Sequence, residues 1–139
     1  AAAMKAKAGF PELQVAADWS VKISTWPNPE QNGFEAMLKL WSRKKHPDGL
    51  LVSDDVVTKG VVQAAFHLGI RIPEDLLVVH HANSDSNIFY PVKMPKIEYD
   101  MDEIAAAAVG QLRLAVAKFK PTESDALKMI KPRLVEVTA

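Results

Sequence analysis

Cysteine is absent from this sequence, and neither sign of charge is in excess. The 139 residues include 17 Lys and Arg and 17 Asp and Glu, so the formal net charge is zero. Without cysteine there is neither a disulfide framework nor a thiolate zinc site. Domains that bind nucleic acid through its phosphates usually present a basic face. The charge balance therefore argues against direct DNA or RNA binding by this stretch.

Long apolar runs and catalytic signatures are also missing. The longest alanine-rich run, residues 104–109, is far too short to span a bilayer, and no signal peptide is recognisable. No phosphate-binding glycine loop, G-x-S-x-G or H-E-x-x-H motif occurs. A nucleophile, an acid and a base can be picked out at Ser53, Asp54–Asp55 and His81, but such triples often arise by chance and do not indicate an enzyme. We expect a non-enzymatic cytoplasmic protein without cofactor, metal or membrane contact.

What the sequence does contain is an alternation of strand-like and helix-like segments. Short apolar or alternating segments at 19–23, 50–52, 76–79, 96–99 and 129–137 predict strands. Segments at 1–8, 34–41, 56–68 and 101–119 have helical spacing. Asp54 or Asp55, with Asp55 favoured, is the expected N-cap of the helix over 56–68. This order predicts one α/β domain whose mainly parallel sheet is flanked by helices. Ligands of such sheets bind beyond the carboxyl ends of the strands, here near residues 25–26, 53–54 and 81–83.

One segment is distinctive enough to indicate a family. The stretch PDGLLVSDDVVTKGVVQAAFHLGIRIPEDLLVVHHAN resembles the effector-binding domain of lactose-repressor-type (LacI/GalR) transcription regulators. The family pattern runs from P-D through N-D-x-x-A-x-G and an amphipathic helix to V-P-x-D and an apolar strand ending G-F-D-D. The matching positions are Pro47, Asp48, Asp55, Gly60, Gly69, Ile72, Pro73, Asp75, Val78 and Val79.

The resemblance implies a two-lobed, periplasmic-binding-protein-like fold, of which residues 1–139 are mostly the C-terminal lobe. A DNA-binding helix-turn-helix and most of the N-terminal lobe are then expected upstream. The opening AAAMKAKAGF, a helix without an N-cap, agrees with that expectation. In the family the segment matching 96–119 belongs to the N-terminal lobe. Its apolar stripe is therefore expected to be covered by a second copy or by a rearranged packing.

Three residues at strand ends are candidates for contact with a ligand. Trp26 lies in a proline-rich loop where family members often place an aromatic against the effector; the alternative is that it plugs its own loop. Asp54 stands where the family commonly has an effector-binding asparagine, and a carboxylate keeps the acceptors but loses the amide donors. Ala82 matches an aspartate that typically receives effector hydroxyls, so ordinary sugar recognition is in doubt. Asn83, at the following position, partly compensates.

The adjacent histidines at 80 and 81 suggest metal binding only at first sight. Neighbouring residues of a strand point to opposite faces, so His80 and His81 do not readily share one ion. We expect one ring to be packed and His81 to line the ligand pocket. Since imidazole titrates near neutral pH, such a contact would make binding pH-dependent.

The resemblance also implies a homodimer through the C-terminal lobe. An apolar loop tip is costly to expose, although its aromatics have the alternative of folding back onto their own domain. The residues predicted to face the partner are Lys59, Val62, Gln63, Phe66, Ile88, Phe89 and Tyr90.

Together these features predict the effector-sensing domain of a LacI-type regulator, which binds a small polar molecule such as a sugar or nucleoside. It would reach DNA only through a headpiece outside this sequence. Two alternatives stay open: a solute-binding protein of a transporter, and a dimerisation domain that has lost its ligand. Alanine at 82 favours the second of these.

Overall fold

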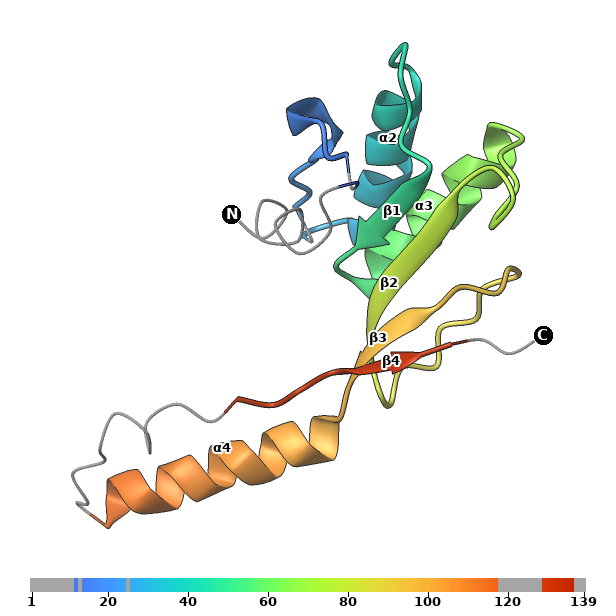
Figure 1. The fold of residues 1–139 in the computed structure, drawn as a ribbon. Helices are drawn as coiled ribbons and strands as arrows, with labels where there is room; N and C mark the ends of the chain where they lie inside the picture. Colours follow the sequence, from blue (N-terminus) through green and yellow to red (C-terminus); the bar gives the residue numbers. More distant parts are fainter. Residues whose placement is uncertain (1–11, 13, 25, 118–128, 137–139) are drawn as a thin grey trace.

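A four-stranded sheet lies at the centre of the protein (Figure 1). The computed structural model describes residues 12, 14–24, 26–117 and 129–136. The strands are β1 (Gly49–Val52), β2 (Leu77–Asn83), β3 (Lys96–Tyr99) and β4 (Arg133–Val135), paired in that order. The first three strands run parallel, and β4 is antiparallel to β3. The predicted α/β fold with a mainly parallel sheet is confirmed.

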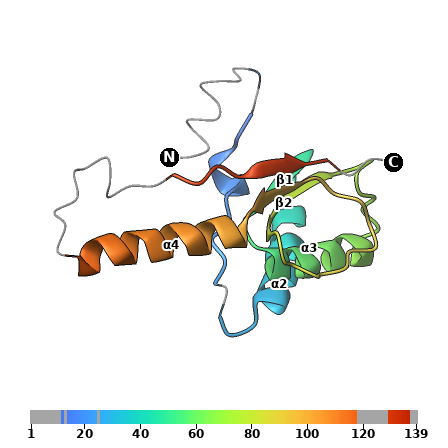
Figure 2. The same ribbon diagram turned by 90° about the horizontal axis from the view of Figure 1, so that it is seen from below.

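One face of this sheet is covered by two helices, α2 (Pro29–Trp41) and α3 (Asp55–His67) (Figures 1 and 2). The strand register brings Val52 beside His80 and Leu50 beside Val78, all on the covered face. Side chains at the intervening positions point to the opposite face, since direction alternates along a strand. There Leu51 is 65% and Leu77 is 48% exposed. The described residues therefore cover the sheet on one side only.

The helices α2 and α3 pack so closely that two glycines are required at their crossing. A Cβ atom on Gly60 would overlap the backbone carbonyl of Glu30 in α2. A Cβ on Gly33 would overlap the carbonyl of Val57 in α3 in the same way. The close approach fixes where α3 begins, and with it the polar residues at its amino end.

The helix α4 (Met101–Val116) extends away from the sheet and buries none of its residues (Figures 1 and 2). The helix predicted over 101–119 is confirmed as far as Val116; residues 118 and 119 lie outside the described residues. A rearranged packing does not cover its apolar positions within the described part of the chain.

The strand predicted at 19–23 was wrong. Trp19 ends a short 3-10 helix, η1 (Ala17–Trp19), and residues 20–24 join no ladder among the described residues. Trp19 and Ile23 nevertheless pack against the core, so the alternation correctly marked the side that faces inward. The helix predicted at 1–8 lies outside the described residues.

No helix in the described ranges is long and apolar enough to cross a membrane.

The Gly60 contact makes a sharp prediction. Gly60→Ala should lower the free energy of unfolding by about 1–3 kcal/mol or more, because backbone has to move to admit the methyl group. Gly110→Ala in α4 is the matched control, since nothing lies within 4 Å of the added atom. There the better helix propensity of alanine should stabilise slightly, by up to about 1 kcal/mol. Urea denaturation followed by circular dichroism measures both; equal effects would contradict the close crossing.

Candidate ligand-binding edge of the sheet

Polar residues follow the strands at the edge of the sheet where the parallel strands end. Asp54 comes just after β1, Asn83 is the last residue of β2, and Asp100 follows β3. Because β1, β2 and β3 are parallel, their carboxyl ends meet at this one edge, together with the amino end of α3 (Figure 1). Ligands of open α/β sheets bind at such edges.

Asp54 is the N-cap of α3. Its Oδ1 accepts a hydrogen bond of 2.8 Å from the backbone N–H of Val57. Its backbone is extended (φ −153°, ψ 137°), as a cap requires. The preference for Asp55 as the cap was wrong, because Asp55 is already the first helical residue. The second oxygen of Asp54, Oδ2, makes no hydrogen bond within the described residues and remains an acceptor.

Asp55 instead ties the loop after β2 to α3. Its carboxylate accepts 2.6 Å from the hydroxyl of Ser86, and its backbone carbonyl accepts 2.7 Å from the hydroxyl of Tyr90. Burial and the nearby Asp55 raise the pKa of Tyr90 well above its ordinary value, so this phenol stays protonated as a donor. The segment between β2 and β3 is thereby held against the covered face.

The two histidines point to opposite faces of β2, as predicted. His80 is 4% exposed and packs edge-on against the ring of Tyr90, with 4.9 Å between centroids. His81 is half-buried on the open face, where its ring lies edge-on to Tyr99 at 4.7 Å. Its Nδ1 lies 3.2 Å from the carbonyl oxygen of Ser53. Since a carbonyl only accepts, Nδ1 of neutral His81 carries the proton, and the buried Nε2 is left as an acceptor without a partner in the described residues.

Trp26 and Asn83 are both open to solvent. The Trp26 side chain is 81% exposed, so it does not plug its own loop. The loop that it begins lies beside the start of α3, because Pro27 and Val56 line the same surface hollow of about 560 Å³. Asn83 is exposed at the end of β2, and its backbone carbonyl accepts from the N–H of Ser86. Asp54, His81 and Asn83 thus share one edge, with the Trp26 loop next to it.

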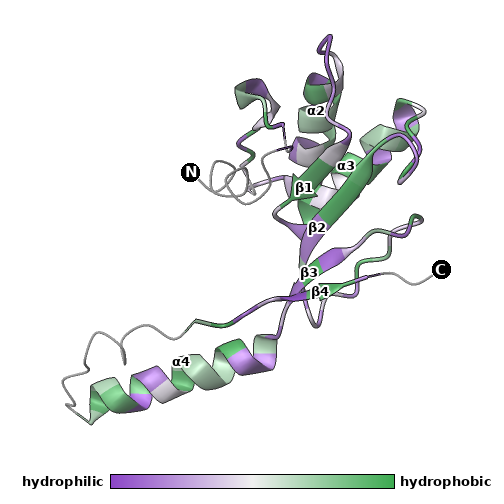
Figure 3. Ribbon diagram, viewed as in Figure 1, coloured by the Kyte–Doolittle hydropathy of each residue, from purple (hydrophilic) through white to green (hydrophobic). Residues whose placement is uncertain are grey.

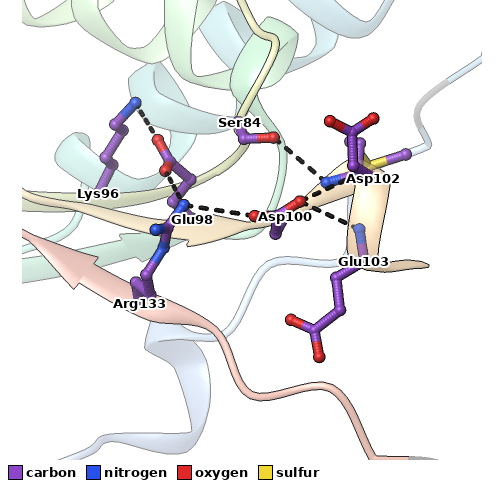
Figure 4. Close-up of polar contacts among 8 residues, drawn as sticks. Ser84, Lys96, Glu98, Asp100, Asp102, Glu103 and Arg133 are labelled. Atoms are coloured by element: carbon purple, nitrogen blue, oxygen red, sulfur yellow. Dashed lines mark hydrogen bonds and ion pairs between the residues drawn. The ribbon is translucent and has the colours of Figure 1, made fainter. Parts of the chain in front are cut away.

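A polar network that the sequence did not predict lies at the junction of β3 and α4 (Figure 4). Glu98 forms ion pairs with Lys96 at 2.5 Å and with Arg133 of β4 at 3.2 Å. The hydrogen bond from Lys96 and the charge of Arg133 lower the pKa of Glu98. Arg133 also reaches Asp100, 3.7 Å away.

The same junction fixes the start of α4. Asp100 Oδ1 accepts from the backbone N–H groups of Asp102 and Glu103, 3.1 Å each, and the hydroxyl of Ser84 accepts from the N–H of Met101 (Figure 4). An aspartate directly before a helical pattern is an N-cap signature, so the cap was readable in the sequence. The ion pairs of Glu98 with Lys96 and Arg133 could not be read from the sequence.

The residues predicted to face a second copy are not all available to one. Val62 is 2% exposed within the chain's own core, which removes it from that surface. Tyr90 folds back onto α3 through its hydroxyl. Phe66 and Phe89, at 52% and 82% exposed, remain open. Lys59 and Gln63 both bind the carboxylate of Glu30, and Ile88 is half-buried.

The described residues contain no group of three His, Asp or Glu side chains placed to hold a metal ion.

The Asp54 cap can be separated from any role in binding. Asp54→Ala should lower the free energy of unfolding by about 0.5–2 kcal/mol, because the N–H of Val57 loses its acceptor. Asp54→Asn keeps an acceptor oxygen and should retain most of the stability. Urea denaturation of the three proteins measures this. A loss as large for asparagine as for alanine would contradict the capping geometry.

His80 predicts a pH dependence of stability. Burial lowers its pKa below the ordinary value of 6.5, against the backbone of His81 and the carboxylate of Asp55, while Lys96 adds to the lowering. The unfolded chain therefore binds this proton more readily, and stability falls as the pH drops below about 6.5 through the folded pKa. Thermal unfolding between pH 7.5 and 5 should show a shallower decline for His80→Phe. An identical decline of the unfolding temperature with pH in both proteins would show that His80 contributes nothing to the pH dependence of stability.

Comparison with known proteins agrees with this geometry. The family of periplasmic binding protein-like domains matches residues 7–136. The chain is 25% identical over 124 residues to the HTH-type transcriptional repressor PurR of Klebsiella pneumoniae (strain 342), and 26% identical to PurR of Salmonella arizonae. Each alignment covers 89% of this chain and 35% of the repressor, so the chain spans about a third of the length of these relatives.

Solved structures of LacI family transcriptional regulators are also similar to this chain. A LacI family transcriptional regulator from Arthrobacter sp. FB24, in complex with lactose, is 25% identical with a TM-score of 0.65, covering 76% of this chain and 39% of the other. A sugar-binding LacI family regulator from Escherichia coli, complexed with phosphate, has a TM-score of 0.72 at 18% identity and covers 96% and 45%. The predicted resemblance to LacI-type effector-binding domains is confirmed: the chain belongs to the family of periplasmic binding protein-like domains.

Proposed function

We propose that this chain is part of the effector-sensing domain of a LacI-type transcriptional regulator and binds a small polar ligand at the carboxyl edge of its sheet. The observation that carries the proposal is that β1 and β2 are adjacent and parallel, so Asp54, His81 and Asn83 all lie toward the carboxyl ends of these two strands. The PurR repressors and the LacI family regulators that the chain resembles support the regulatory role.

The chemistry of the edge favours a ligand that is rich in hydrogen-bond donors. Asp54 offers Oδ2 and the Asn83 amide both donates and accepts, while the Nε2 of His81 is buried and becomes available only if its ring moves. An exposed indole at Trp26 supplies a flat apolar surface on which the face of a sugar or a nucleobase can stack. Among the related structures, one contains lactose and another, from Lactobacillus casei, contains bound sucrose. A sugar or a nucleoside fits this donor and acceptor set.

The position of Ala82 favours one competing reading. Ala82 is 4% exposed and its side chain offers no acceptor, so one polar contact expected from the family is missing. A domain that only dimerises would tolerate this loss. The amide of Asn83, at the next position and exposed, is what favours retained ligand binding.

The proposed function includes a homodimer and an indirect action on DNA. Phe66 and Phe89 are the open apolar groups of the predicted dimer face and support pairing there. The net charge of the chain is zero, which does not favour phosphate binding, so we assign contact with DNA to a headpiece elsewhere in the protein. A ligand would act by favouring one arrangement of the lobes over another.

Ligand binding is tested by NMR titration of the chain with lactose, sucrose, adenosine and guanosine. We expect at least one compound to shift the amide signals of Asp54, His81 and Asn83 and the indole signal of Trp26. Asn83→Ala should weaken that binding several-fold, because it removes both a donor and an acceptor. Asn87→Ala, an exposed asparagine in the loop after β2, is the matched control. Silence toward all four compounds would favour the dimerisation-only alternative, and shifts confined to other residues would place the site elsewhere.

A further inference from the structure

A second hollow, of about 260 Å³, lies between the sheet and the loop that joins β2 to β3. His80 of β2 and Lys96 of β3 both line it, and these two residues are partners in the register of the strands. His80 is buried on the covered face, whereas His81 points to the open face, since direction alternates along a strand. Residues 80–96 supply the whole lining, so this hollow is separate from the candidate ligand-binding edge.

Much of the wall of this hollow is apolar. The apolar groups that line it are those of Ala82, Ile88, Val92, Met94 and the ring of Tyr90. Figure 3 shows hydrophobic and hydrophilic residues mixed along the loop that carries most of them. The two hydroxyl groups of the wall are already engaged, because Ser86 and Tyr90 both donate to Asp55. The walls therefore offer contact area to an apolar body and little competition from water-binding groups.

The charge of the hollow is positive. Lys93 and Lys96 both line it, and none of its lining side chains is acidic. Lys96 forms an ion pair with Glu98 at 2.5 Å, but an ammonium group carries three N–H donors, so a second acceptor is within its capacity. Neither Glu98 nor Asp55 lines the hollow, and both carboxylates are engaged by other groups. An acceptor with negative charge therefore complements this hollow.

We propose that the hollow is a second ligand site, which binds a small carboxylic acid with a compact apolar body. The carboxylate would accept from Lys96 and Lys93, since hydrogen bonds between ionised groups are the strong ones. The body would pack on Val92, Met94 and the ring of Tyr90. Pockets for drug-sized ligands usually measure about 300–1,000 Å³, so a hollow just below that range suits a smaller acid.

Other classes of small molecule fit the hollow less well. A cation would be repelled by the two lysines that line it. A sugar, which suits the donor and acceptor set of the candidate edge, would leave the apolar walls without contact and would find both wall hydroxyls engaged. An inorganic anion would satisfy the lysines but would leave the apolar walls in water. The combination of one acid group with an apolar body is what the lining selects.

NMR titration of the chain with benzoate tests the acid group and the apolar body together. Benzoate should shift the amide signals of residues 92–96 and the imidazole signals of His80. Benzamide has the same shape without the charge, and acetate has the charge without the ring, so each should bind several-fold more weakly. Benzamide or acetate binding as tightly as benzoate would overturn the proposal. So would the absence of any shift with benzoate, which would mean that the hollow contains only water.

Single substitutions locate the binding. Lys96→Gln should weaken benzoate binding several-fold, an effect between that of an exposed ion pair and that of a buried hydrogen bond to a charged group. Lys44→Gln is the matched control, because it removes the same charge at the exposed turn after α2. Val92→Phe, which fills part of the hollow, should abolish the binding. Circular dichroism of each variant checks that it is folded.

The outcomes separate this site from the proposed ligand site at the edge of the sheet. Equal losses in Lys96→Gln and Lys44→Gln would reduce the effect to net charge and contradict the site, as would full binding by Val92→Phe. Benzoate shifts confined to Asp54, Asn83 and Trp26 would place the acid at the edge and also contradict it. The titration needs no ligand at that edge, so either site can fail without the other.

Discussion

The pairing of β2 with parallel strands on both sides is the constraint on which the rest of the structure depends. β1 and β3 both run in the direction of β2, so three carboxyl ends and the amino end of α3 meet at one edge. Without this register Asp54 and Asn83, 29 positions apart in the sequence, would not lie at the same edge of the sheet. The glycine contacts between α2 and α3 support the same arrangement by fixing where α3 begins.

The two histidines of the central strand β2 point to opposite faces of the sheet and have different surroundings. His80 points to the covered face, where burial keeps it neutral beside Tyr90. His81 points to the open face, beside Tyr99 and the carbonyl of Ser53. One ring therefore belongs to the packing of the loop after β2, and the other belongs to the polar edge. The alternation of a strand alone produces this separation of a structural and a candidate binding role.

Much of the fold could be predicted from the sequence because its signals are local. Helical spacing placed α2, α3 and α4, and the apolar runs placed β1 and β2. The alternation at 19–23 identified Trp19 and Ile23 as inward-facing but not as a strand, because alternation reports which side is buried and says nothing of a hydrogen-bonding neighbour. The sequence predicts Val62 at an interface, yet Val62 is buried in the core, because its exposure depends on how closely α3 packs, which no local pattern reveals.

The candidate site was predictable in its positions and less so in its contacts. The strand ends pointed to Asp54, His81 and Asn83, while the choice between Asp54 and Asp55 as the cap turned on one residue of helix boundary. The pairing of Glu98 with Arg133 depends on the register of β3 and β4 across 35 positions, which the sequence does not show.

Amide hydrogen exchange measured by NMR tests the central position of β2 most directly. If β2 is paired on both sides, the amides that face β1 (Leu77 and Val79) and those that face β3 (His80 and Ala82) should all exchange much more slowly than those of residues 20–24, which join no ladder among the described residues. Exchange at similar rates in the two segments would contradict the parallel register, and with it the shared edge on which the proposed ligand site rests.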